Sequence, residues 1–136
     1  MQRLVDRTLL IDDSDIDLFI QRRFLEVYNF SSELQLYKSA EEALSWLRGL
    51  SVTEVPDIIF LDLNMPEFDG FAFLRQFKEL PATVQEKARI VVLTSSNSSK
   101  DREQAFSFPN VIQFITKPLK QTDIEELRTL IGKSVK

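Results

Sequence analysis

Five short apolar runs recur along the chain and constrain its fold more than any other feature. They occupy residues 8–11, 33–37, 57–61, 90–93 and 111–115. Four of them are nearly continuous in apolar residues, which is typical of parallel strands covered on both faces of a sheet. The run at 33–37 alternates more, so we predict that it forms a strand at an edge of the sheet.

The segments between these runs carry apolar residues at helical spacing, and two of them begin with capping signals. Ser39 and Glu42 are the ends of a capping box, and the segment from Thr122 to Glu125 is predicted to cap the last helix. A weaker helical pattern covers 100–106, and the long segment 81–87 predicts an extra helical turn. The apolar positions at helical spacing are Ile16, Ile20, Phe24 and Val27; Ala43, Leu44 and Leu47; Phe71, Leu74 and Phe77; and, predicted to face inward, Ile124, Leu127, Leu130 and Ile131.

Strands and helices therefore alternate in five units, which predicts the α/β fold class. Such alternation indicates a doubly wound (βα)5 three-layer sandwich, with a parallel sheet, right-handed crossovers and helices on both faces. A length of 136 residues fits one domain. We expect a single domain over residues 1–136, with no output domain.

The composition excludes several classes of chemistry. The chain contains neither cysteine nor histidine, which excludes disulfides, thiolate chemistry and metal ligation by these residues, and any phosphohistidine must belong to a partner. The net charge of −4 gives no electrostatic footprint for DNA or for anionic lipid. No apolar stretch has the length of a signal peptide or of a membrane span, so we expect a cytoplasmic protein that binds neither DNA nor membrane.

The residues best suited to chemistry follow the predicted strands. Asp12 and Asp13 follow the first strand, Asp62 the third, Thr94 the fourth and Lys117 the fifth. Doubly wound sheets bind ligands outside the carboxyl ends of their strands, so these side chains are expected to share one crevice. Carboxylate oxygens without histidine or cysteine favour a hard cation such as Mg²⁺. With a lysine and a hydroxyl beside them, they suit transfer of a phosphoryl group to a carboxylate nucleophile.

Each of these residues also has an ordinary structural interpretation. Either Asp12 or Asp13 alone would more often cap the first helix. Asp62 is compatible with a turn, Thr94 with an ordinary strand end, and Lys117 with a solvated surface position. Taken together, their occurrence at the ends of four different predicted strands favours a common site.

The chain resembles the receiver domain of bacterial response regulators over essentially its whole length. Four ordered segments carry the resemblance: Leu9-Leu10-Ile11-Asp12-Asp13; Ile59-Phe60-Leu61-Asp62-Leu63-Asn64-Met65-Pro66 running to Asp69-Gly70; Val92-Leu93-Thr94-Ser95; and Phe114-Ile115-Thr116-Lys117-Pro118. The resemblance implies a flavodoxin-like fold with a five-stranded sheet in the order 2-1-3-4-5.

The resemblance also implies a phosphoryl acceptor and a magnesium site. Asp62 resembles the phospho-acceptor and is also expected to bind the metal. Asp13 resembles the direct carboxylate ligand of Mg²⁺, and Asp12 a ligand that acts largely through water. Asn64 would contribute its backbone carbonyl, and both Asn64 and Ser96 lie at positions that tune the phosphoryl lifetime in this family.

The remaining matches imply a response to phosphorylation. Thr94 and Lys117 would hold the phosphoryl oxygens, and Phe114 lies where the family carries a switch aromatic coupled to Thr94. Pro118 would follow a cis peptide bond that turns Lys117 into the site.

The segment 14–17 reads Ser-Asp-Ile-Asp and is unusually acidic for the start of the first helix. The two acidic residues either raise the affinity for a cation slightly or interact favourably with the helix dipole. We favour the helix dipole.

The implied partner carries phosphohistidine and is a histidine kinase or a histidine phosphotransfer protein. A downstream protein, or a second copy of this chain, is expected to bind the face made by the helix 100–106, the strand 111–115 and the last helix. Phe106 and Phe108 lie near that edge. We therefore expect a phosphorelay switch rather than an enzyme, with slow autodephosphorylation.

Two other functions draw on the same residues. A magnesium-dependent phosphatase of the haloacid dehalogenase type uses an aspartate nucleophile followed two residues later by an acid, whereas Asp62 is followed by Asn64. A degenerate receiver would act only as a binding module, and the complete residue set argues against it. Turnover of a free phosphate ester would favour the phosphatase, and absence of phosphoryl uptake would favour the binding module.

Overall fold

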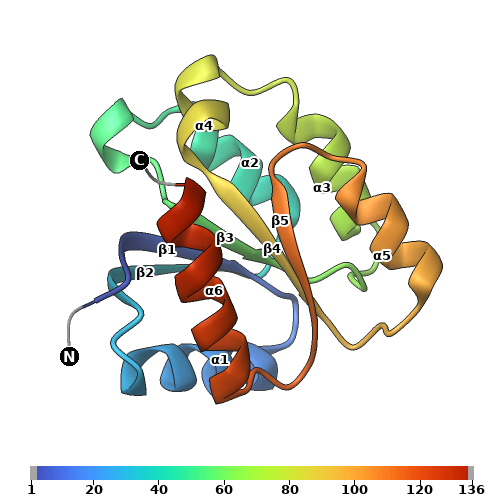
Figure 1. The fold of residues 1–136 in the computed structure, drawn as a ribbon. Coiled ribbons are helices and arrows are strands. Elements are labelled where there is room, and N and C mark those ends of the chain that lie inside the picture. The colour runs from blue at the N-terminus through green and yellow to red at the C-terminus, as the bar shows by residue number, and fades with distance from the viewer. Residues whose placement is uncertain (1–2, 135–136) are drawn as a thin grey trace.

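The computed structural model describes residues 3–134, which form a parallel five-stranded sheet with helices on both faces (Figure 1). The strands are β1 (Val5–Ile11), β2 (Ser31–Tyr37), β3 (Ile58–Leu61), β4 (Arg89–Thr94) and β5 (Val111–Thr116). Their order is β2-β1-β3-β4-β5, and all neighbouring pairs are parallel. The predicted fold class, strand order and edge position of β2 are confirmed.

Helices connect the strands in the predicted order. They are α1 (Asp15–Val27), α2 (Ala40–Arg48), the 3-10 turn η1 (Val52–Glu54), α3 (Gly70–Phe77), α4 (Ala82–Lys87), α5 (Ser99–Phe106) and α6 (Gln121–Ser134). Helix α4 is the extra turn predicted at 81–87. Helices α1 and α6 cover one face of the sheet, while α2, α3, α4 and α5 pack on the other (Figure 1). No helix within residues 3–134 is long and apolar enough to cross a membrane.

The core consists of two apolar clusters, one on each face of the sheet. In β1, Leu9 and Ile11 belong to the cluster under α2 and α3, while Leu10 belongs to the cluster under α1 and α6. In β3, Ile59 and Phe60 divide between the two clusters in the same way, because successive side chains of a strand point to opposite faces. Burial on both faces explains why these strands are continuous in apolar residues.

Helix α1 does not place its predicted apolar stripe against the core. Its core-facing residues are Leu18, Gln21 and Leu25, and Phe24 is only partly buried. The helix carries apolar residues on more than one side, so their spacing alone does not identify the side that faces the core. The side chains left in solvent are Ile16, Phe19, Ile20 and Val27, which are 72%, 62%, 52% and 61% exposed.

The predicted caps differ in outcome. The Ser39 hydroxyl accepts a hydrogen bond from the backbone N–H of Glu42 at 3.2 Å, so Ser39 caps α2 as predicted, but among the described residues the Glu42 side chain does not complete the capping box. At the last helix, the carboxylate of Asp123 instead accepts the backbone N–H of Lys120 at 2.8 Å. Thr122 therefore lies inside α6 and does not cap it. This correction shifts the start of the helix but leaves Ile124 facing inward as predicted.

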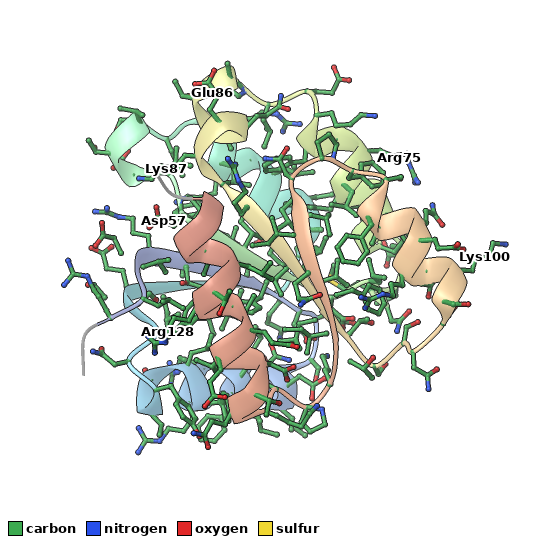
Figure 2. All side chains as sticks on the ribbon, in the orientation of Figure 1. Asp57, Arg75, Glu86, Lys87, Lys100 and Arg128 are labelled. Atoms are coloured by element: carbon green, nitrogen blue, oxygen red, sulfur yellow. The ribbon has the colours of Figure 1, made fainter. Side chains whose placement is uncertain are left out.

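Asp57 aligns the two central strands at their amino-terminal ends. Its Oδ2 accepts the backbone N–H groups of Asp6 and Arg7, both at 3.1 Å, and its Oδ1 lies 3.9 Å from Lys87 Nζ. Figure 2 shows Asp57 and Lys87 at the same end of the sheet. This contact supports the register of β1 on β3, in which Ile11 is paired with Leu61.

Candidate functional site

Strands β1 and β3 end side by side and bring three aspartates together. Asp12 follows Ile11 and Asp62 follows Leu61, and the N–H of Asp62 donates to the carbonyl of Ile11 at 3.1 Å. Asp12 and Asp62 are buried, whereas Asp13 is exposed. Carboxylate oxygens from the three residues all lie within 4.8 Å of one another. The structure therefore gathers the three predicted carboxylates into one cluster.

The donor chemistry of this cluster fits a hard divalent cation. Its ligand atoms are all carboxylate oxygens, which suit Mg²⁺ better than metals that prefer nitrogen or sulfur. Carboxylates this close repel one another, and a bound cation would relieve the repulsion. Asp12, Asp13 and Asp62 are the residues that could hold it, and the part assigned to the Asn64 carbonyl stays a prediction.

Lys117 is held inside the cluster and is not a solvated surface lysine. Its Nζ lies 2.7 Å from Asp12 Oδ2, 2.7 Å from Asp17 Oδ2 and 3.3 Å from Asp62 Oδ2, and its side chain is only 15% exposed. Burial alone would lower the pKa of Lys117. The hydrogen bonds to Asp12 and Asp17 and the charge of Asp62 outweigh burial and raise that pKa above its ordinary value, so the site holds a permanent positive charge.

Asp12 is almost completely buried. Its oxygens accept from the N–H of Ser14 at 3.0 Å, from Lys117 at 2.7 Å and from Gln21 Nε2 at 3.4 Å. Burial raises the pKa of Asp12, the hydrogen bonds from Lys117 and Ser14 lower it, and the charge of Asp62 raises it again. The net effect is a raised pKa, so a nearby cation would stabilise its ionised form.

Neither Asp12 nor Asp13 caps the first helix. The N-cap of α1 is Ser14, whose hydroxyl accepts the N–H of Asp17 at 3.2 Å. The capping interpretation of the two aspartates is therefore wrong. Both are left available for the site.

Asp17 is a site residue that the sequence analysis did not identify. Its carboxylate binds Lys117, whereas Asp15 in the same turn pairs with Lys38 at 3.0 Å. The acidic segment 14–17 was the available signal, but the helix-dipole interpretation treated its aspartates alike. The contact of Asp17 with Lys117 depends on how α1 lies against the loop after β5, which no local pattern predicts.

Asn64 connects the acidic cluster to the end of β4. Its backbone N–H donates to Asp62 Oδ1 at 3.1 Å, so Asp62 also serves the turn that follows β3. Its side-chain Nδ2 donates to Thr94 Oγ1 at 3.1 Å and to Ser95 Oγ at 3.3 Å. The Thr94 oxygen also accepts the N–H of Ser96 at 3.3 Å. Thr94 is completely buried, and its part in holding a phosphoryl oxygen stays a prediction.

Gly70 lets helix α3 begin directly against the segment that carries Asp62. A Cβ atom at Gly70 would lie 2.6 Å from the Asp62 carbonyl oxygen and 2.7 Å from Leu63 Cα. Asp69 caps the helix by accepting the N–H of Ala72 at 2.9 Å. The Asp-Gly pair therefore provides a helix cap followed by a close backbone contact.

The end of β5 brings Lys117 to the site. The N–H of Lys117 donates to the carbonyl of Thr94 at 2.8 Å, which extends the pairing of β4 with β5. The peptide bond between Lys117 and Pro118 is cis, as predicted.

Phe114 is buried in this structure and contacts a cation. It is 7% exposed and belongs to the core cluster on the face of α2, α3 and α5. The Arg102 guanidinium lies 5.1 Å from the centre of the Phe106 ring and 5.9 Å from that of Phe114. Its NH1 group donates to the Phe114 carbonyl at 3.4 Å. The ring thus already occupies a buried position, and its coupling to Thr94 stays a prediction.

The fold and this set of strand-end residues define the receiver class of doubly wound domains. The chain belongs to the response regulator receiver domain family, whose model matches residues 8–129. A solved response regulator receiver protein from Dyadobacter fermentans DSM 18053 is 32% identical, with a TM-score of 0.83 over 94% of this chain and 96% of that chain. A two component response regulator from Cytophaga hutchinsonii is 28% identical, with a TM-score of 0.86 over 94% and 97%.

The same receiver domain also occurs as part of larger related proteins. The probable methanogenesis regulatory protein FilR2 of Methanothrix harundinacea (strain 6Ac) is 30% identical over 125 residues, which cover 86% of this chain and 75% of that protein. Hybrid signal transduction histidine kinase L of Dictyostelium discoideum is 27% identical over 132 residues. That match covers 97% of this chain but only 8% of the kinase. The shared unit is the receiver domain of two-component signalling.

Proposed function

We propose that the protein is a cytoplasmic phosphorelay switch that accepts a phosphoryl group on Asp62, with Mg²⁺, from the phosphohistidine of a histidine kinase or histidine phosphotransfer protein. The observation that carries the proposal is the cluster of Asp12, Asp13 and Asp62 oxygens within 4.8 Å of one another, with Lys117 Nζ 3.3 Å from Asp62. Such an arrangement offers a nucleophile, a cation site and a fixed positive charge in one place.

In the proposed transfer, a carboxylate oxygen of Asp62 attacks the phosphorus atom. The new O–P bond forms as the N–P bond of the donor breaks, and the bonding electrons remain on the imidazole nitrogen of the donor. Asp12, Asp13, Asp62 and the carbonyl of Asn64 would hold Mg²⁺, which neutralises charge on the transferring group when bound. Lys117, whose Nζ lies 3.3 Å from Asp62 Oδ2, would donate to a phosphoryl oxygen.

The response to phosphorylation is proposed to begin at Thr94. Its hydroxyl oxygen accepts from Asn64 and Ser96, and it donates to none of the described residues, so its proton is available to a phosphoryl oxygen. A shift of Thr94 would alter the packing beside β5, where Phe114 and Arg102 join the strand to α5. The face of α5, β5 and α6 is therefore the proposed contact for a downstream protein or a second copy of this chain.

The donor is proposed to dock on the exposed apolar side of α1. Ile16, Phe19 and Ile20 lie on the helix whose Asp17 reaches Lys117 in the site. A donor must bring its phosphohistidine to Asp62, so its surface has to pass beside this turn of α1. Exposed apolar side chains gathered next to a reaction site are typical of a protein contact.

Acetyl phosphate provides the direct test of the acceptor. With Mg²⁺, the wild type is expected to gain the mass of one phosphoryl group and to lose it to hydroxylamine, as an acyl phosphate does. Asp62→Asn is expected to stay unmodified. A stable phosphoester on serine or threonine would contradict the proposal. A panel of phosphorylated histidine kinases and phosphotransfer proteins then identifies the donor.

The same experiments separate the two rival functions. Repeated turnover of p-nitrophenyl phosphate would identify a phosphatase instead of a switch. Failure of phosphoryl uptake from acetyl phosphate and from every kinase in the panel would identify a binding module. For the switch, chemical shifts of the beryllofluoride-bound protein are expected to change at Phe114 in the wild type but not in Thr94→Ala. Shifts confined to the acidic cluster would contradict the coupling.

A further inference from the structure

Lys117 is shared unequally among three carboxylates. Its nitrogen lies 2.7 Å from Asp12 and from Asp17 but 3.3 Å from Asp62. An ammonium group has three hydrogens to donate, so these carboxylates account for all of them. The two shorter contacts draw the positive charge away from Asp62, toward β1 and α1.

Asp17 is the partner of this ammonium group that lies outside the cation-binding cluster. The cluster consists of Asp12, Asp13 and Asp62, whereas Asp17 projects from the first turn of α1 and its side chain is 39% exposed. Its backbone N–H is held by the Ser14 hydroxyl at 3.2 Å, so the carboxylate extends from an ordered turn. An anion at this place attracts the ammonium group without being one of the clustered cation ligands.

We propose that Asp17 is a positioning residue that holds the Lys117 ammonium on the α1 side of the site, away from Asp62, and so leaves the carboxylate of Asp62 available to Mg²⁺. The inference rests on the function proposed above. Mg²⁺ and the ammonium group are both cations and compete for the same oxygens of Asp12 and Asp62. Without the Asp17 carboxylate, Lys117 would pair with Asp12 and Asp62 alone, and Mg²⁺ would have to displace a tighter pairing.

Asp15 offers a matched control for the charge of Asp17. Both residues lie in the first turn of α1, but the carboxylate of Asp15 pairs with Lys38 at 3.0 Å. Asp15→Asn therefore removes one negative charge from the same turn without releasing Lys117. Comparison of Asp15→Asn with Asp17→Asn separates the effect on Lys117 from a general electrostatic effect on the cation.

The test is a double-mutant cycle on Mg²⁺ affinity, measured by isothermal titration calorimetry. Asp17→Asn is expected to weaken Mg²⁺ binding about five-fold, which corresponds to about 1 kcal/mol, and Asp15→Asn less than about two-fold. In a Lys117→Ala background, the effect of Asp17→Asn is expected to fall below about two-fold. Lys117→Met keeps most of the apolar stem and replaces Lys117→Ala in the cycle if the alanine variant does not fold.

Two results would overturn the inference while leaving the proposed function intact. In one, Asp17→Asn and Asp15→Asn change the affinity equally. In the other, the full five-fold loss persists without Lys117, which would show that Asp17 acts only as a distant charge. Failure of the wild type to bind Mg²⁺ would instead overturn the proposed function and the inference with it.

An NMR measurement in EDTA tests, in the absence of metal, whether Asp17 positions the Lys117 ammonium group. The ¹⁵N–¹H signal of the Lys117 ammonium group is expected to shift in Asp17→Asn and to stay in place in Asp15→Asn. An unchanged Lys117 signal in Asp17→Asn would contradict the positioning role.

Discussion

Gly70→Ala is expected to destabilise the protein and to disturb its site in the same step. A Cβ atom at this position would lie 2.6 Å from the carbonyl oxygen of Asp62 and 2.7 Å from the Cα of Leu63. Both of these neighbours are backbone atoms, so they cannot move aside as the end of a flexible side chain could. Either α3 or the segment that carries Asp62 has to shift.

The size of the effect follows from the cost of overpacking a buried contact. Inserting a methyl group into a tightly packed region lowers the free energy of unfolding by about 1–3 kcal/mol. For a domain of this size, that loss corresponds to a fall of roughly 4–12 °C in the melting temperature. Because the close contact is with the backbone of Asp62, Mg²⁺ binding is expected to weaken as well.

Gly132→Ala is the matched control, because a Cβ at Gly132 would meet no atom of the described residues within 4 Å outside its chain neighbours and its own helix backbone. Gly132 lies in α6, where alanine is favoured over glycine by about 0.5–1 kcal/mol. This variant is therefore expected to be more stable than the wild type and to bind Mg²⁺ unchanged. Urea denaturation of both variants in EDTA measures the stability, and calorimetry measures the metal. A Gly70→Ala protein as stable as Gly132→Ala would refute the steric reasoning.

Four further predictions concern other parts of the molecule. Mg²⁺ at a hundredfold excess over its dissociation constant is expected to stabilise the fold by about 2.7 kcal/mol, and equal melting temperatures with Mg²⁺ and with EDTA would contradict the metal site. Thr8→Val is expected to raise the free energy of unfolding in urea by about 1 kcal/mol, because the buried Thr8 hydroxyl has no partner among the described residues. Burial raises the pKa of Asp12 in the folded protein, so its carboxyl group lowers stability as the pH rises from the unfolded value of about 3.9 through the folded pKa. Asp12→Asn is therefore expected to be more stable than the wild type in EDTA at pH 7, with no such advantage below a pH of about 4. Phe19→Ser is expected to slow transfer from a phosphorylated kinase but not from acetyl phosphate, and equal slowing with both donors would contradict docking on α1.

The strands and the acidic cluster could be predicted because each follows from the sheet itself and does not depend on how individual side chains pack. Residues such as Leu9 and Leu10 are both apolar because β1 is buried on both faces. In a parallel sheet the carboxyl ends of the strands lie together, so the residues after them have to meet. Asp12, Asp13 and Asp62 were placed correctly for this topological reason.

The orientation of α1 and the contact of Asp17 could not be predicted in the same way. Apolar side chains on α1 point to more than one side, and the sheet selects Leu18 and Leu25 for the core. That choice leaves Ile16 in solvent and also turns Asp17 toward Lys117. Both facts follow from one rotation of the helix about its axis, which is a tertiary property.

The residues that precede Asp12 and Asp62 show why the fold can tolerate the negative charge of the acidic cluster. Asp12 and Asp62 follow strand ends whose preceding residues, Ile11 and Leu61, are almost completely buried and paired in register. The apolar burial that stabilises the sheet therefore lies directly beneath the carboxylates. Lys117 offsets part of the repulsion, and a bound cation would offset more. A ligand that changes the charge of this cluster can then act on the strand ends and the loops that leave them while the sheet beneath stays intact.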